Sequence, residues 1–210
     1  MNFPNFSFMR AHSMAALLIF PLAAAWAQPA AKPASAESEK EATAPNPDND
    51  LIAVVKTELG TFRMEFAPDK APKHVEQFIK LSKEGFYDGT GFFRVGRGHI
   101  DGGDPNTKDP KAEKKTWGSG GMDLLSPEFN DMKFDRGTVA TFHAFKHGDG
   151  AQFFILVTPQ PLLERAFTAF ARVTDGFDVI DKISQAPAAE NGITDNPVRI
   201  IKITFEKKKK

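Results

Sequence analysis

The sequence predicts one mostly β domain, a closed or nearly closed antiparallel barrel capped by two helices. Several short apolar runs have the spacing of strands, turn residues separate them, and only two segments have helical spacing. Many short strands with so few helices are typical of a barrel. The 20 phenylalanines of the chain supply the apolar bulk that one core of this kind needs.

The domain is expected to begin with a hairpin, at residues 52–57 and 61–66. Apolar and polar residues alternate in the second run, so one of its faces is buried. The apolar positions there are Phe62, Met64 and Phe66.

A helix is expected next, because prolines at positions 68 and 72 suit a first helical turn, where the missing N–H would have no partner. Its inward face is Val75, Phe78, Ile79 and Ser82. Gly85 is expected to end it.

The later elements follow from the same patterns. Further strands are expected at residues 92–95, 137–142, 152–157, 167–173 and 198–205, and a second helix at 178–183. Residues 96–103 contain four glycines, so the backbone there turns sharply or passes close to another group. Residues 104–121 are polar and loop-like.

The N-terminal segment has the pattern of a secretory signal. Arg10 and His12 precede an apolar run at residues 14–24, and Ala25 and Ala27 supply the small residues that a signal peptidase requires. We expect cleavage after residues 1–27, export to the periplasm, and no transmembrane segment in the mature chain. The run is shorter than the about 20 apolar residues that span a bilayer; an uncleaved anchor is the alternative.

Composition divides the rest of the chain. Residues 28–50 are rich in Ala, Pro, Glu, Ser and Lys, which predicts a disordered linker. Residues 51–206 have the length of one domain, and residues 207–210 are expected to be a solvated lysine tail. The chain has no cysteine, so packing alone must stabilise the domain. A formal net charge of zero without a basic stripe argues against a nucleic-acid partner.

Two separated segments indicate the chemistry. One ends in Phe92-Phe93-Arg94-Val95 and is followed by Gly102-Gly103-Asp104; the other is Gly150-Ala151-Gln152-Phe153-Phe154-Ile155. With the segments at 85–90, 128–130, 136–140 and 170–176, they resemble the cyclophilin family of peptidyl-prolyl cis-trans isomerases. The resemblance covers nearly the whole domain and implies an eight-stranded barrel.

The resemblance implies catalysis without a metal or a cofactor. Arg94 matches the catalytic arginine, and Gln152 matches the glutamine that helps to bind the substrate backbone. A guanidinium stays charged and holds its donors in a rigid fork, which suits stabilisation of a twisted prolyl amide. The implied partners are proline-containing, unfolded or partly folded polypeptides, and we expect a monomer that speeds the folding of exported proteins.

Eight further residues are expected to bind the substrate. The resemblance assigns them to the proline pocket or to contacts with the substrate backbone: His99, Ile100, Asp101, Phe142, His143, Phe154, Leu163 and Phe167. Taken alone, Phe154 would be a core residue and the histidines spectators, because a metal site needs several ligands together.

The chain also departs from the family pattern. The segment between Arg94 and the paired glycines is one residue shorter than usual, and Asp101 stands where a glutamine is usual. Phe93 replaces a common histidine. Leu162 stands where some members have a tryptophan that contacts cyclosporin, so we expect weak inhibition by that drug.

Other functions are weighed beside this one. The altered residues 99–101 leave open a catalytically weak proline-peptide-binding module or chaperone, and a barrel can also bind a small apolar ligand. The spacing of Asp101, Asp104 and Asp109 lacks the alternating ligands of a calcium loop. Ser119 and Ser126 lack the neighbouring His and Asp of a hydrolase.

Overall fold

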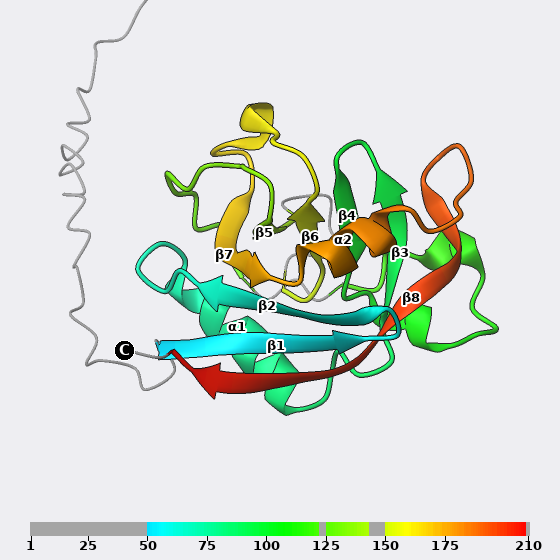
Figure 1. Cartoon of the computed structure of the whole chain (residues 1–210), viewed down its shortest axis with the longest axis horizontal. Coiled ribbons are helices and arrows are strands. Elements are labelled where there is room, and N and C mark those ends of the chain that lie inside the picture. Colours follow the sequence, from blue (N-terminus) through cyan, green and yellow to red (C-terminus); the bar gives the residue numbers. More distant parts are fainter. Residues whose placement is uncertain (1–49, 122–124, 143–149, 209–210) are drawn as a thin grey trace, which may run out of the picture. The chain divides into compact units, whose positions relative to one another are not determined.

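Eight strands close into a barrel in the order β1-β2-β7-β5-β6-β4-β3-β8 (Figure 1). The computed structural model describes residues 50–121, 125–142 and 150–208. The strands are β1 Leu51–Thr57, β2 Gly60–Phe66, β3 Gly91–Gly96, β4 His99–Gly102, β5 Thr138–Thr141, β6 Phe153–Leu156, β7 Thr168–Asp175 and β8 Ile193–Lys207. The helices are α1 Pro72–Lys83 and α2 Phe177–Ser184, and short 3-10 turns lie at Pro105–Lys108, Lys114–Thr116 and Pro161–Leu163. The expected class, a closed antiparallel barrel with two helices, is confirmed.

One strand, β4, was not expected from the sequence. Its four residues pair with β3 on one side and with β6 on the other, so the barrel would be open without it. The turn before it is short: Gly96 pairs with His99 across Arg97 and Gly98. Four residues with two polar side chains are too short a run to show a strand period.

The last strand closes the barrel. β8 pairs with β3 through its first part and with β1 through its second part. It continues through Lys207, which pairs with Leu51, and the Lys208 N–H donates to the carbonyl of Asp50 at 2.7 Å. The lysine tail expected from residue 207 is thus in part a strand.

Most of the largest buried side chains of the domain are aromatic. Phe78 of α1 stacks on Tyr87 with 4.9 Å between ring centroids and meets Phe153 edge-on at 5.7 Å. The Tyr87 hydroxyl donates to the carbonyl of Ala151 at 2.9 Å. Burial of these rings accounts for a domain without disulfides, since each fully buried one contributes about 1.5–3 kcal/mol.

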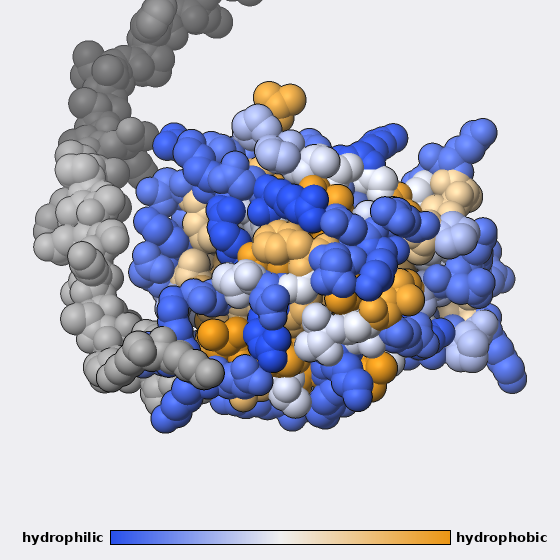
Figure 2. Space-filling model, in the orientation of Figure 1, coloured by the Kyte–Doolittle hydropathy of each residue, from blue (hydrophilic) through white to orange (hydrophobic). Residues whose placement is uncertain are grey.

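The outside of the domain is mostly charged. Figure 2 shows one face on which hydrophilic side chains predominate, with separate hydrophobic spots between them. Within the described ranges, neither helix is long and apolar enough to cross a membrane.

A second, smaller apolar cluster lies apart from the barrel core. In β6, Phe153 and Ile155 belong to the main core, whereas Phe154 and Leu156 belong to the second cluster. This division follows from the alternation of side chains along a strand. The remaining buried members are Phe134, Ala140 and Ala169, with Met132, Phe142, Leu163 and Phe167 packed against them.

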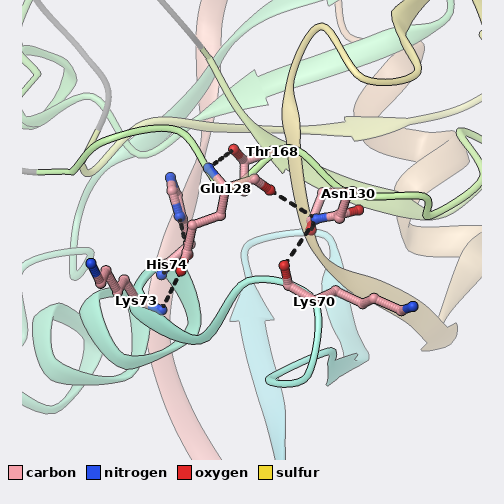
Figure 3. A network of polar contacts seen from close by, with 7 residues as sticks. Lys70, Lys73, His74, Glu128, Asn130 and Thr168 are labelled. Carbon is pink, nitrogen blue, oxygen red and sulfur yellow. Dashed lines mark hydrogen bonds and ion pairs between the residues drawn. The ribbon is translucent and has the colours of Figure 1, made fainter. Parts of the chain in front are cut away.

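A carboxylate from a distant loop caps the start of α1 (Figure 3). Ala71, at the N-cap, offers no side-chain acceptor. Glu128 supplies one instead: its two oxygens accept the N–H groups of Lys73 at 3.2 Å and His74 at 3.0 Å. The His74 ring, which is buried, lies 2.6 Å from the same carboxylate.

The loop that carries Glu128 is also held to β7 (Figure 3). The Glu128 N–H donates to the Thr168 hydroxyl at 3.0 Å. The side-chain amide of Asn130 donates to the carbonyls of Ala169 at 2.8 Å and Lys70 at 3.4 Å. Residues 128–130 therefore join α1 to the strand beside the second apolar cluster.

Replacing Glu128 by alanine should lower the free energy of unfolding by about 1–3 kcal/mol, because it removes the acceptor of two helix N–H groups and of a buried histidine. Urea unfolding followed by circular dichroism measures this. The matched control is Glu76→Ala, on the exposed side of α1, which should change stability by less than about 0.5 kcal/mol. Equal losses in the two variants would contradict the capping role.

Candidate active site

An arginine and an aspartate face each other across the β3–β4 ladder. Arg94 and Asp101 are cross-strand partners, and the Arg94 Nε–H donates to Asp101 Oδ2. The Asp101 side chain is fully buried, whereas that of Arg94 is 42% exposed. The buried carboxylate therefore fixes one edge of the guanidinium and leaves the rest of it open to a ligand.

His99 contacts the other oxygen of the same carboxylate. Its Nε2 lies 3.3 Å from Asp101 Oδ1. Burial raises the pKa of Asp101 above its ordinary value, and the charges of Arg94 and His99 oppose that rise only in part. Arg94, Asp101 and His99 thus form one polar group on one face of the hairpin.

Aromatic side chains line the space next to Arg94. The Phe154 ring lies 4.9 Å from Phe142 and 5.4 Å from Phe167, between centroids, and meets Phe167 edge-on. The Arg94 Cζ stands 5.8 Å from the Phe142 centroid. His99 contacts Phe154 from the other side, at 5.7 Å. These three phenylalanines belong to the second apolar cluster and form a packed aromatic group, the phenylalanine cluster, with a guanidinium at its edge.

Gln152 precedes β6 and is 3% exposed. Its Nε2 is buried and has no hydrogen-bond partner among the described residues, and the same holds for the Thr141 hydroxyl at the end of β5. Buried donors without partners are uncommon and costly. Gln152 therefore has an unsatisfied donor that is buried within the site.

The structure brings together most of the residues expected from the sequence. Arg94, His99 and Asp101 form the polar group described above, and Leu163 packs in the same apolar cluster as the three phenylalanines. Leu162, on the Pro161–Leu163 turn, is 93% exposed. His143 lies outside the described residues.

Ile100 lies neither in the phenylalanine cluster nor in the polar group around Arg94. It is fully buried in the main barrel core and pairs with Ile155 of that core. His99 and Asp101, its neighbours in β4, point to the opposite face, as side chains in a strand alternate. The assignment of Ile100 to substrate binding is corrected accordingly.

The pattern of the sequence did not indicate two of the site residues. Phe134 is buried beside Phe154, with 6.4 Å between centroids, and comes from a segment without regular structure. Thr141 stands next to Phe142 but has no distinguishing spacing. Only the three-dimensional arrangement identifies them.

A cavity of about 460 Å³ adjoins Arg94. Phe142 lines this cavity and also packs in the phenylalanine cluster, so the cavity and the cluster are neighbours. The remaining lining residues are Val95, Gly96, Arg97, His99, Glu190, Asn191 and Gly192.

A buried aspartate just after β4, Asp104, has its hydrogen-bond partners within the protein. Asp104 is buried, and its carboxylate accepts the N–H groups of Asn106 at 2.8 Å and of Gly118. It thereby folds the polar loop that follows β4. In the part of the chain that the structure describes, no group of three His, Cys, Asp or Glu side chains could hold a metal ion.

Comparison with known proteins agrees with this architecture. Residues 52–205 match the family described as cyclophilin type peptidyl-prolyl cis-trans isomerase/CLD. A "probable peptidyl-prolyl cis-trans isomerase" of Brucella abortus is 37% identical over 172 residues, which are 79% of this chain and 86% of that protein. A "peptidyl-prolyl cis-trans isomerase" of Synechococcus elongatus is 39% identical over 125 residues, covering 59% of this chain and 80% of that protein.

Among solved structures, a cyclophilin-type isomerase of Cryptosporidium parvum superimposes with a TM-score of 0.64 at 23% identity. The match covers 75% of this chain and 98% of that one, so the two share a fold. The sequence match alone spans the whole barrel, from β1 to β8. This chain therefore belongs to the cyclophilin-type peptidyl-prolyl cis-trans isomerase family.

Proposed function

We propose that the chain accelerates cis–trans isomerisation of X–Pro bonds in polypeptides and that Arg94 stabilises the twisted amide. The observation that supports this most directly is the guanidinium fixed by a buried carboxylate, at the edge of a phenylalanine cluster and of a cavity. Family membership supports the reaction class.

The chemistry asks for one well-placed donor. Rotation about the peptide bond has a barrier of about 18–20 kcal/mol because it breaks amide resonance. In the twisted state a lone pair is localised on the prolyl nitrogen. A fixed donor beside that nitrogen stabilises the twisted state more than either planar state, and so lowers the barrier.

The other residues have supporting roles. Phe142, Phe154 and Phe167 would hold the apolar proline ring, and the free Gln152 N–H would hold a substrate carbonyl. Asp101 acts on Arg94 rather than on the substrate. Because it occupies Nε–H, it leaves the terminal nitrogens of the guanidinium to face the ligand.

The substrates would be proline-containing segments of unfolded or partly folded chains. One of the Cryptosporidium parvum structures was solved in the presence of the dipeptide Ala-Pro. An uncatalysed X–Pro step takes tens to hundreds of seconds, so an isomerase would matter wherever such steps limit folding. We also propose that the protein acts as a monomer.

Arg94→Ala should lower kcat/KM on a short X–Pro peptide on the order of 10²-fold, because it removes the donor at the reacting nitrogen. A protease-coupled isomerisation assay measures this. Arg63→Ala is the matched control, since Arg63 is a barrel arginine paired at the surface with Asp175. It should keep full activity.

The same assay, together with a titration of peptide binding, separates catalysis from binding alone. If the folded wild-type protein binds the peptide saturably without accelerating its slow phase, the fold serves as a proline-peptide-binding module. A fully active, folded Arg94→Ala protein would instead remove Arg94 from the mechanism.

The pH dependence of activity tests the role of Asp101. Because burial raises its pKa in the native state, it takes up a proton at a higher pH than an ordinary carboxyl does. Activity should therefore fall as the pH drops through a range above about 4, where Arg94 loses its anionic partner. The raised pKa also means that this protonation does not itself destabilise the fold.

Asp101→Asn should remove that acid limb and lower activity at neutral pH about fivefold, because a neutral acceptor holds the guanidinium less firmly. His99→Gln should keep the limb, which separates the aspartate from its neighbour. An unchanged acid limb in Asp101→Asn would exclude Asp101 as its source.

We further propose that the protein is exported and acts in the periplasm after loss of residues 1–27. The support is the charge, the length of the apolar run and the small residues of that segment. Intact mass of the protein recovered from the periplasm of an expressing bacterium should correspond to a chain that begins at Gln28. Recovery of the full-length mass only from the membrane fraction would favour the uncleaved anchor.

A further inference from the structure

The cavity beside Arg94 is placed to receive more of the polypeptide than the proline. It adjoins the phenylalanine cluster, because Arg94 and Phe142 line the cavity and contact that cluster. Residues 190–192 also line it, and they are held to β3 by a 2.8 Å hydrogen bond from the Val95 N–H to the Gly192 carbonyl. At about 460 Å³ it is large enough for a further side chain with its backbone.

The most unusual residue in this cavity is Arg97. With Gly98 it forms the two-residue turn between β3 and β4, and both have positive φ, 51° and 85°. Turns of this kind favour Asn, Asp or Gly, because other side chains are strained in the left-handed region. Arginine at the first position does not favour the turn, which suggests that it is present for the interactions of its side chain.

The turn is fixed in position by the segment after β6. The Gly98 carbonyl accepts the N–H groups of Val157 at 2.8 Å and Thr158 at 3.2 Å. The Gln160 side chain donates to the Arg97 carbonyl at 3.2 Å. A side chain on Gly98 would collide with Gln160 and Thr158, which shows how closely the turn is packed. The base of the Arg97 side chain is therefore held rigidly at the cavity wall.

Arg97 is also the cation there without a fixed counter-ion. The charge of Arg94 is matched by buried Asp101, and the His99 ring faces the same carboxylate. Among the described residues, Arg97 makes no ion pair. Glu190 is the acidic residue that lines the same cavity. It is exposed and does not form an ion pair with Arg97.

We propose that this cavity is a subsite for a residue that flanks the substrate proline, and that Arg97 makes it favour an acidic side chain. The proposal rests on the isomerase function proposed above and names a substrate class for it. A carboxylate in the subsite would pair with the guanidinium of Arg97. Glu190 would weaken this preference, since it repels the same carboxylate.

The test uses four sets of X–Pro peptides, one set for each of the two positions before the proline and the two positions after it. Within a set, that position carries Asp, Asn or Lys. For each peptide we would measure both kcat/KM and the Kd of binding by fluorescence anisotropy. At one position, the Asp peptide should be preferred over the Lys peptide about two- to fivefold, as expected for a partly exposed ion pair. Added salt should reduce the preference.

Variants of Arg97 and Glu190 should shift the preference in opposite directions. Arg97→Asn should abolish it and Arg97→Glu reverse it, whereas Arg97→Lys should keep it and Glu190→Gln should increase it. Asn also suits positive φ, so Arg97→Asn should raise Tm while it loses selectivity. A rise in stability that accompanies a loss of selectivity is not expected of a residue that only forms the turn.

Arg165→Asn is the matched control. Arg165 is the other described non-glycine residue with positive φ, 61°, and it is exposed and does not line the cavity. The change removes the same charge and relieves the same kind of backbone strain. It should raise Tm as well, yet leave the ratio between Asp and Lys peptides unchanged.

The two measurements distinguish failure of the subsite from failure of the enzyme. Equal kcat/KM and Kd for Asp and Lys peptides at every position would overturn the subsite even if catalysis is strong. A loss of preference in Arg165→Asn as large as in Arg97→Asn would also overturn it, since net charge would then be the cause. If no peptide is isomerised, an Arg97-dependent difference in Kd still supports the subsite, and only the proposed catalysis falls.

Discussion

The ion pair between Arg94 and Asp101 is the interaction on which the site depends. A charged carboxylate that is fully buried is costly unless it is paired, and Arg94, the cross-strand neighbour of Asp101, supplies that partner. In return, the aspartate restricts a long, flexible side chain to one orientation. Such prearrangement is what distinguishes an electrostatic catalyst from a surface charge.

The alternation of side chains along the strands separates stability from function. In β4 and β6, one face fills the barrel with Ile100, Phe153 and Ile155, and the other presents the site residues. The loop with Glu128 and Asn130 then covers the outer cluster and joins it to α1. The site is therefore built on rigid strands, although it lies outside the main core.

Much of the fold and of the candidate site could be predicted from the sequence, because the motifs that indicate them are local. Arg94, Gln152 and Phe154 each stand at a fixed place in a short, distinctive segment. Ile100 was misassigned because the segment after Arg94 lacks one residue, and a shift of one position along a strand moves a side chain to the other face. Two contacts depend on tertiary structure that no local pattern contains. One is the ion pair of Asp101 with Arg94. The other is the cap of α1 by Glu128, which is 55 residues away in sequence from Lys73.

The pairing of β1 with β8 has a consequence for how the chain folds. The strand that begins at Leu51 lies beside the one that ends at Lys207, so the barrel cannot close until the last of these residues is available. Contacts so distant in sequence slow folding, since the intervening chain must be ordered first. Synthesis delivers the N-terminal strands well before their partner, and during that interval their edges are unprotected and open to aggregation. A member of an isomerase family would thus itself complete its fold only after its last barrel strand, β8, has been synthesised.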